Sequence, residues 1–344
     1  MNNLKNAFKL IFFLFVVSYM PLRAQESIED RISVVENTVS RLPRISPNLN
    51  LRYRYDDTDG SNGFDVRRAR LDIRGNVTTP LEYRIHLEFA NDPKVLDANI
   101  NWKIRPNLAL MAGQYKIPFS LENPYNPNAL EMIENSLVIT NLVNYSDVSG
   151  LSANGRDVGL SLNGSFLQRD GFSLINYYFG VFNGSGINTT DNNKAKDFSG
   201  ILSINPIKQL TLGLSHYNGK TGASDNMFQR VRNGFGVKYD DNRLLVRSEY
   251  ITGKTWDGMK YLNSEGAYAV GAYYVAPKIQ VLARYDYFKR DIDNENTQQL
   301  HYTAGVNYFP VNHVRLQFNF IRRTQSSDNY MNNNLIVTQL WIRF

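Results

Sequence analysis

Apolar and polar residues alternate without a break along residues 81–89, Leu81-Glu82-Tyr83-Arg84-Ile85-His86-Leu87-Glu88-Phe89. Successive side chains of a β-strand point to opposite faces, so this stretch predicts a strand with one apolar and one charged face. Residues 95–105 repeat the pattern, with polar residues between Leu96, Ala98, Ile100, Trp102 and Ile104. A soluble antiparallel sheet alternates in the same way where one side faces water. The length of such segments distinguishes a soluble sheet from one that spans a membrane.

Segments of nine to twelve residues with this alternation run from Asn48 to the last residue, and we count sixteen of them. Soluble strands usually have about five or six residues, whereas a tilted strand needs about nine to eleven to cross a bilayer. The segments are residues 48–57, 64–75, 80–90, 95–105, 108–118, 156–166, 172–183, 197–205, 209–218, 230–240, 243–252, 267–276, 279–289, 300–309, 313–323 and 335–344. They predict an all-β fold, a transmembrane antiparallel β-barrel of about sixteen strands over residues 48–344.

The connections between the segments alternate in length. Tight links lie at 105–107, 240–242, 276–278 and 310–312, and longer polar ones at 183–196, 218–229, 253–266 and 290–299. Outer-membrane barrels have short periplasmic turns and longer extracellular loops, with both termini on the periplasmic side. The sheet must be closed, because every backbone N–H and C=O needs a hydrogen-bond partner in hydrocarbon. A barrel of this strand number encloses an aqueous channel.

The composition agrees with this architecture although it resembles that of a soluble protein. The 344 residues are 42% hydrophobic, and the mean hydropathy is -0.38. Such averages are expected where half of each strand faces lipid and half faces water. The chain has no cysteine, which excludes a disulfide framework and thiolate metal sites. We expect no cofactor and no bound metal.

The N-terminus carries the features of a signal peptide over residues 1–24. The apolar run from Leu10 to Val17 follows Lys5 and Lys9, and a small residue, Ala24, precedes the predicted cleavage site. The alternative is a buried N-terminal helix. Cleavage would remove three bases and no acid, which lowers the net charge from +6 to +3. So mild a positive charge does not point to nucleic acid as a partner.

Residues 25–47 predict a short periplasmic helix. Apolar residues recur there with heptad spacing, at Ile28, Ile32, Val35, Val39 and Leu42. Such a segment either pairs with other copies in a coiled coil or lies as a single amphipathic helix on its own domain. Two prolines, at 43 and 47, end it in either case.

Several motifs of the chain resemble those of the phosphate-selective porin O and P family. The stretch from Gly113 to Phe119, Gly-Gln-Tyr-Lys-Ile-Pro-Phe, is similar to the Gly-Gln-aromatic-Lys-x-Pro-Phe signature of that family. The stretch from Arg156 to Gly159, Arg-Asp-Val-Gly, is similar to the Arg-Asp-x-Gly motif on the following strand. Further similarities are residues 180–184, 284–288 and 303–308 and the terminal Phe344. The resemblance covers the chain from about residue 48 to its end.

This resemblance implies a trimeric porin in the outer membrane of a Gram-negative bacterium. In the family a third extracellular loop folds inward to narrow the pore, and well-studied members conduct anions with lumenal arginines and loop lysines. The implied partners are outer-membrane lipid and lipopolysaccharide, two further copies of the chain, small anionic or polar solutes, and the barrel-assembly machinery, which reads a last strand ending in Phe.

The polar faces of the predicted strands carry more bases than acids. The candidate pore-lining and anion-contacting bases are Arg52, Arg54, Arg68, Arg70, Arg74, Arg84, Lys103, Arg105, Lys116, Arg156, Lys238, Arg247, Arg284 and Arg315. The acids expected on the same faces are Asp72, Glu82, Glu88, Asp97, Asp157, Glu249 and Asp286. Guanidinium groups stay charged and match oxyanions with forked donors, so the excess predicts a mild anion preference. The alternative is a structural role, in which the arginines face the acids across the pore.

The longest connection, residues 119–155, is the candidate constriction loop and is called the long loop below. It carries Glu122, Glu131, Glu134 and Asp147 but neither Lys nor Arg. It therefore lacks the loop lysines that the family uses for phosphate, and high phosphate selectivity does not follow from the resemblance. We expect these acids to face the arginine wall and create a transverse field. The apolar residues between 130 and 139 predict a short helix against the inner wall; the alternative is an extracellular flap.

Other functions are less well supported by the sequence. The four histidines, His86, His216, His301 and His313, lie on or beside different strands and in no catalytic motif, so we expect no enzyme. A specific sugar or peptide channel would be indicated if Tyr268 and Tyr274 lined the pore as stacking surfaces. A structural or adhesin barrel plugged by its loops is the remaining alternative.

Overall fold

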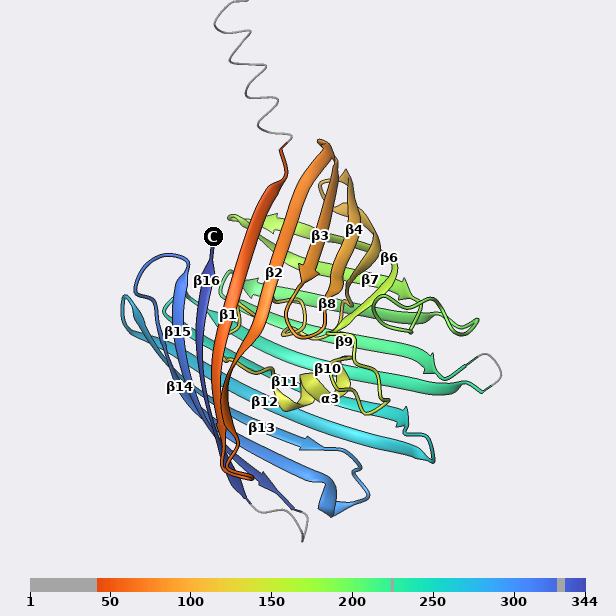
Figure 1. The fold of residues 1–344 in the computed structure, drawn as a ribbon. Coiled ribbons are helices and arrows are strands. Elements are labelled where there is room, and N and C mark those ends of the chain that lie inside the picture. The colour runs from red at the N-terminus through yellow and green to blue at the C-terminus, as the bar shows by residue number, and fades with distance from the viewer. Residues whose placement is uncertain (1–41, 224–225, 327–331) are drawn as a thin grey trace, which may run out of the picture. The chain divides into compact units, whose positions relative to one another are not determined.

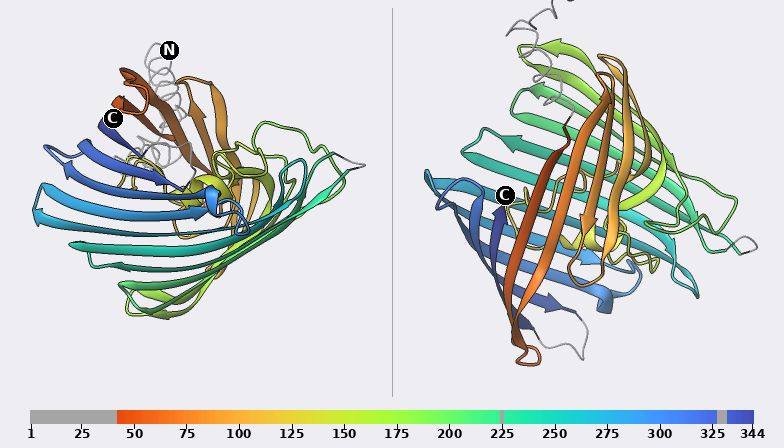
Figure 2. Two further views of the ribbon diagram at one scale, coloured as in Figure 1. Left: turned by 90° about the horizontal axis from the view of Figure 1, so that it is seen from below. Right: turned by 45° about the horizontal axis from the view of Figure 1, so that its top comes forward.

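The computed structural model of the chain describes residues 42–223, 226–326 and 332–344. The predicted signal peptide lies outside the described residues, and so does the predicted periplasmic helix except for its last residues. Sixteen antiparallel strands form a closed barrel in which each strand pairs with its neighbours in sequence and β1 pairs with β16 (Figures 1 and 2). The predicted barrel of sixteen strands is thus confirmed. None of the helices in the described ranges is long and apolar enough to cross a membrane.

The strands lie close to the predicted segments. They are β1 (Arg44–Asp56), β2 (Asn62–Thr78), β3 (Leu81–Glu88), β4 (Lys94–Arg105), β5 (Leu108–Lys116), β6 (Arg156–Arg169), β7 (Phe172–Phe182), β8 (Asp197–Ile207), β9 (Leu210–Thr221), β10 (Phe228–Asp240), β11 (Leu244–Trp256), β12 (Tyr261–Ala276), β13 (Ile279–Lys289), β14 (Gln298–Tyr308), β15 (Val314–Gln325) and β16 (Asn333–Arg343). Two short helical elements, α3 (Leu137–Leu142) and η1 (Glu295–Thr297), interrupt the connections.

The predicted connection 253–266 is too long. Strands β11 and β12 stay paired as far as Trp256 and Tyr261, which leaves only residues 257–260 as the link. At this end of the sheet polar residues occupy both faces, so the apolar alternation disappears while the backbone ladder continues. Alternation of apolar and polar residues reveals a strand only where its two faces lie in different environments. Where both faces are polar, the strand continues without that pattern.

The two faces of the barrel wall differ as the alternation predicts. On β9, the outward Leu214 is 57% exposed, whereas the inward Ser215 and Tyr217 are 8% and 2% exposed. The terminal strand follows the same rule, with Leu340 and Ile342 on one face and Gln339, which bonds to Gln317 of β15, on the other. An outer surface of this kind suits lipid, where unpaired polar groups are costly.

A β-bulge on β2 breaks the alternation at one functionally important place. Asn50 pairs with Arg68 and Leu51 pairs with Val66, so Arg67 is an extra residue on β2. Its guanidinium donates hydrogen bonds to the carbonyl oxygen of Ile133 (2.6 Å) and to the side chain of Gln339 (3.2 Å), both inside the barrel. Arg67 and Arg68 therefore both point inward, although strict alternation puts Arg67 toward lipid.

The long loop lies inside the barrel and supplies seven of the buried residues of the main apolar cluster. Helix α3 contacts β11, β12 and β13, and its residues Val138 and Ile139 are completely buried (Figures 1 and 2). They pack with Phe119 and Val143 of the loop against inward residues of the wall. The observed helix covers only the end of the apolar run from which it was predicted. Leu130, Met132 and Ile133 lie before it and are not helical.

Small residues of the wall make room for the loop. A Cβ added to Gly266 of β12 would lie 2.9 Å from Cγ2 of Val138, and one added to Gly236 of β10 would lie 2.7 Å from Cδ1 of Leu121. Both distances are too short for ordinary packing. Glycine at both positions thus permits the close approach of the loop to the wall.

Candidate pore constriction

The start of the long loop is held by one carboxylate of β11. Glu249 accepts hydrogen bonds from the Ser120 hydroxyl (2.9 Å) and from the backbone N–H groups of Leu121 (2.7 Å) and Glu122 (3.0 Å). It also accepts one from the hydroxyl of Tyr268 on β12 (2.8 Å). Glu249 is 2% exposed. Because Ser120, Glu122 and Tyr268 are buried as well, this carboxylate fixes the first residues of the loop to the wall.

Each of the four loop acids pairs directly with an arginine of the wall. Arg247 lies 3.0 Å from Glu131 and 3.6 Å from Glu122. Arg232 lies 2.9 Å from Asp147. Glu134 contacts Arg67 at 2.6 Å and Arg52 at 3.1 Å. The acids therefore do not face an arginine wall across a water-filled gap, as the sequence suggested; they attach the loop to it.

The electrostatics of the loop acids follow from these pairs. Burial alone would raise the pKa of Asp147, but the charges of Arg232 and Arg230 and the hydrogen bond from the Ser149 N–H outweigh it and lower the pKa. Burial likewise opposes the effect of Arg67 and Arg52 on Glu134, whose pKa is also lowered. Both carboxylates thus stay charged at neutral pH.

Further bases bind backbone carbonyl oxygens of the loop. Arg315 donates to the carbonyls of Asn128 (2.7 Å) and Leu130 (3.0 Å). Arg284 pairs with Asp286 at 2.6 Å and also donates to the carbonyl of Glu134. These bases position the loop, and because their acceptors on the loop are neutral carbonyl groups, the loop does not neutralise their positive charge.

Lys116, at the end of β5, has the same role at the start of the loop. It donates to the carbonyls of Asn123 and Tyr125, both at 2.5 Å, and is 3.3 Å from the hydroxyl of Tyr145. The lysine of the sequence signature therefore holds the loop by its backbone. Lys238 of β10 donates to the Tyr125 hydroxyl from the opposite side (3.0 Å).

A buried acid, Asp97 of β4, collects three bases from the neighbouring strands. It lies 2.9 Å from Arg156 of β6, 3.1 Å from Arg84 of β3 and 2.9 Å from Nδ1 of His86. Asp97 is completely buried and Arg156 is 2% exposed. Of the predicted site residues, Arg84 and Arg156 are thus brought together around one carboxylate.

A row of arginines follows β1 and β2. Arg70 pairs with Glu88 (2.6 Å), and Arg54 pairs with Asp56 (2.9 Å). Arg68 lies between Arg67 and Arg70 in sequence, and its Nη1 is buried without a hydrogen-bond partner. Among the described residues Arg68 has no acid within ion-pair distance. Arg68 is therefore the member of this row whose positive charge is least compensated.

The remaining predicted bases lie toward the short turns. Arg74 pairs with Asp72 (2.8 Å) and Lys103 with Glu82. A cavity of about 480 Å³ is lined by Arg44, Arg74, Arg315 and Arg343, with Asp72 as its one acid. Arg105 lines a second cavity, described below.

Four inward-pointing arginines are not among the candidates that the sequence analysis named. Arg230 pairs with Asp197 (2.8 Å), Arg232 with Asp147, and Arg323 with Asp56. Arg230 and Arg232 lie an even number of residues from Lys238 on the same strand, and Arg323 lies an even number from Arg315. The alternation of the strands therefore already predicts that these three arginines point inward. For Arg67 no such signal exists, because a bulge reverses its parity.

Of the two tyrosines that would indicate a sugar channel, Tyr268 is buried and Tyr274 is half-buried. Tyr268 points inward but is 1% exposed, and its hydroxyl accepts a hydrogen bond from Arg247 (2.9 Å). Tyr274 packs against Phe309 with ring centroids 5.8 Å apart. In the described parts of the chain, no group of three or more histidine, aspartate or glutamate side chains is placed to hold a metal ion.

Comparisons with known proteins agree on one fold. The family model for phosphate-selective porin O and P matches residues 48–239 and 229–344. An anion-selective porin from Comamonas acidovorans superposes with a TM-score of 0.69 at 14% identity, over 88% of this chain and 99% of that one.

Two further solved structures are similar. OmpF of Salmonella typhi, in complex with daunomycin, gives a TM-score of 0.67 at 12% identity over 89% of this chain and 99% of that one. The trimer form of OmpT from Vibrio cholerae gives 0.61 at 14% identity over 88% and 99%. No curated protein sequence matches the chain.

Proposed function

Since the chain belongs to the phosphate-selective porin O and P family, we propose that this outer-membrane porin, a channel for the passive diffusion of small solutes, prefers anions to cations. The observation that carries the proposal is the uncompensated positive charge of the lumen. Arg68 has a buried Nη1 without a partner, and among the described residues Arg315 binds only neutral carbonyl groups of the loop and the ring of Trp341. Guanidinium groups of this kind attract anions at any physiological pH.

The preference is modest and not specific for phosphate. The long loop has no lysine or arginine, and most lumenal arginines share their charge with an acid within 3.2 Å. A paired arginine contributes less field to the pore than a free one. The channel has no catalytic role in this proposal, because its function needs only diffusion.

Replacement of Arg68 by Gln should lower the ratio of chloride to potassium permeability about twofold, because the substitution removes one uncompensated charge from the lumen. Arg68 is a sharper choice than Arg70, whose loss would leave Glu88 without its arginine, or Arg74, whose loss would leave Asp72 with Arg84 alone. The measurement is the reversal potential of single channels in a KCl gradient. Arg169→Gln, at an exposed turn of β6, is the matched control and should leave the potential unchanged.

Two results would contradict the proposal. A folded barrel that carries no current in planar bilayers is not a pore and would instead support the plugged structural barrel. A reversal potential that favours potassium in the native protein would exclude the anion preference.

We also propose that the barrel forms a homotrimer surrounded by outer-membrane lipid and lipopolysaccharide. The trimer form of a structural neighbour supports this assembly. The barrel-assembly machinery would read β16 and the terminal Phe344, which is 71% exposed. Native mass spectrometry of the detergent-extracted protein should give three times the mass of the mature chain; a monomer at every detergent concentration would contradict the trimer.

A further inference from the structure

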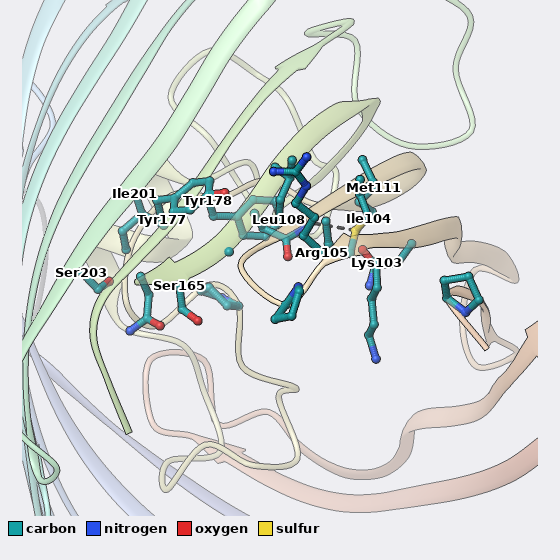
Figure 3. Close-up of a pocket in the computed structure, with 18 of the residues that line it drawn as sticks. Lys103, Ile104, Arg105, Leu108, Met111, Ser165, Tyr177, Tyr178, Ile201 and Ser203 are labelled. Carbon is teal, nitrogen blue, oxygen red and sulfur yellow. Dashed lines mark hydrogen bonds between the residues drawn. The ribbon is translucent and has the colours of Figure 1, made fainter. Parts of the chain in front are cut away.

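A cavity of about 1060 Å³ lies under the first residues of the long loop, beside the inner faces of β4 to β8 (Figure 3). Residues of two short turns, Pro80 and Pro106, line it, so it belongs to the short-turn end of the lumen. This volume lies at the upper end of that of pockets that hold small organic molecules, which have about 300–1000 Å³. It is far larger than an inorganic ion needs.

The walls of the cavity are unusually apolar for a lumen. Met111 of β5, Tyr178 of β7 and Ile201 of β8 form one side, and Leu121 of the loop covers it. The Tyr178 ring is fixed, because it stacks on Tyr115 with centroids 6.5 Å apart and its hydroxyl lies 3.3 Å from the Met111 sulfur. Apolar surface does not contribute to the binding of chloride or phosphate. It does stabilise a bound apolar solute, in proportion to the apolar area that is removed from water.

The charges of the cavity have one sign. Its lining includes Lys103 and Arg105 and no acid. Lys103 is paired with Glu82, whereas Arg105 has no hydrogen bond or ion pair among the described residues. Figure 3 shows both bases on the β4 side, away from Ile201 and Ser203. A carboxylate of a bound solute would find an unoccupied guanidinium fork there.

We propose that this cavity, called the organic-anion pocket, binds organic anions that combine a carboxylate with an apolar or aromatic body. The inference rests on the proposed function, since it names a solute class for the same pore. Arg105 holds the carboxylate, and Met111, Tyr178, Ile201 and Leu121 cover the body. The pocket distinguishes such solutes both from inorganic anions and from neutral molecules of the same shape.

The test is block of the chloride current of the intact porin by acetate, benzoate and the neutral benzamide, added in turn to both sides of the bilayer. Benzoate should block half of the current at a concentration about tenfold lower than either acetate or benzamide, because only benzoate uses both the apolar wall and Arg105. The double variant Met111→Ser/Ile201→Ser should remove the advantage of benzoate over acetate. Arg105→Gln should remove its advantage over benzamide.

Arg44→Gln is the matched control, since it makes the same change of charge in the other cavity, and it should keep both advantages. Equal block by acetate and benzoate in the native protein would contradict the proposed organic-anion pocket. The proposed anion channel would still stand in that case, because the chloride current itself would be present. Equal effects of Arg44→Gln and Arg105→Gln would also contradict the pocket, since the carboxylate would then respond only to the general charge of the lumen. Absence of any chloride current would instead contradict the proposed function.

Discussion

Replacement of Glu249 by Ala is expected to raise the conductance of a single pore about twofold and to make the open current fluctuate, because the long loop loses its anchor. Four hydrogen bonds end on this carboxylate, three of them from residues 120–122. Hydrogen bonds to a charged group contribute about 1.5–3 kcal/mol each. The variant leaves the Leu121 backbone N–H without its acceptor and the Glu122 N–H with the Ser120 hydroxyl alone, so water in the lumen competes for the first residues of the loop.

The measurement is single-channel current in symmetric KCl, with the folded barrel confirmed by its circular dichroism. Glu265→Ala on the neighbouring strand β12 is the control, since Glu265 bonds only to the hydroxyls of Tyr250 and Tyr287, away from the loop. It should leave conductance and noise as in the native protein. If Glu249→Ala has the native conductance, the remaining contacts of the loop suffice to hold it, and the role of Glu249 as anchor is wrong.

Replacement of Asp97 by Asn should destabilise the barrel by about 3–5 kcal/mol, the usual cost of removing one member of a buried ion pair. Asp97 is completely buried and contacts Arg84, Arg156 and His86. The amide cannot balance these bases, so Arg156 becomes a buried charge without an acid. The same change should increase the preference for anions, because the lumen keeps its bases and loses one negative charge.

Urea-induced unfolding in lipid vesicles measures the first effect, and the reversal potential measures the second. Asp92→Asn, in the connection that precedes β4, is the matched control. Its side chain is 79% exposed where it pairs with Lys94, and exposed pairs contribute at most about 1 kcal/mol. Equal stability of the two variants would show that Asp97 does not balance the buried bases.

Most of the fold was predictable because a barrel wall has two different solvents. Lipid outside and water inside impose a period of two on every strand, and the same period gave the strand count and the inward direction of Arg52, Arg84 and Arg247. The end of the pattern is also physical. At residues 253–256 and 261–266 of β11 and β12, polar residues occur on both faces, so the sequence no longer marks the strand.

The sequence by itself could not place the residues whose surroundings depend on the long loop. Val270 and Ala272 of β12 are apolar and point inward, against the alternation, because helix α3 and its neighbours cover that part of the wall. The sequence around the four loop acids does not identify the arginines with which they pair, because these arginines lie on strands as distant in sequence as β1 and β11.

The amino-acid sequence therefore determined the number of strands, the closure of the sheet and the excess of positive charge on its inner face, since each depends on local alternation. Which of those charges remain available to a solute depends on how the loop and the strands pack in three dimensions. The bulge at Arg67, the pairing of every loop acid with an arginine and the free guanidinium of Arg105 arise from contacts between distant segments. Such contacts depend on shape and distance in three dimensions, and a local pattern contains neither.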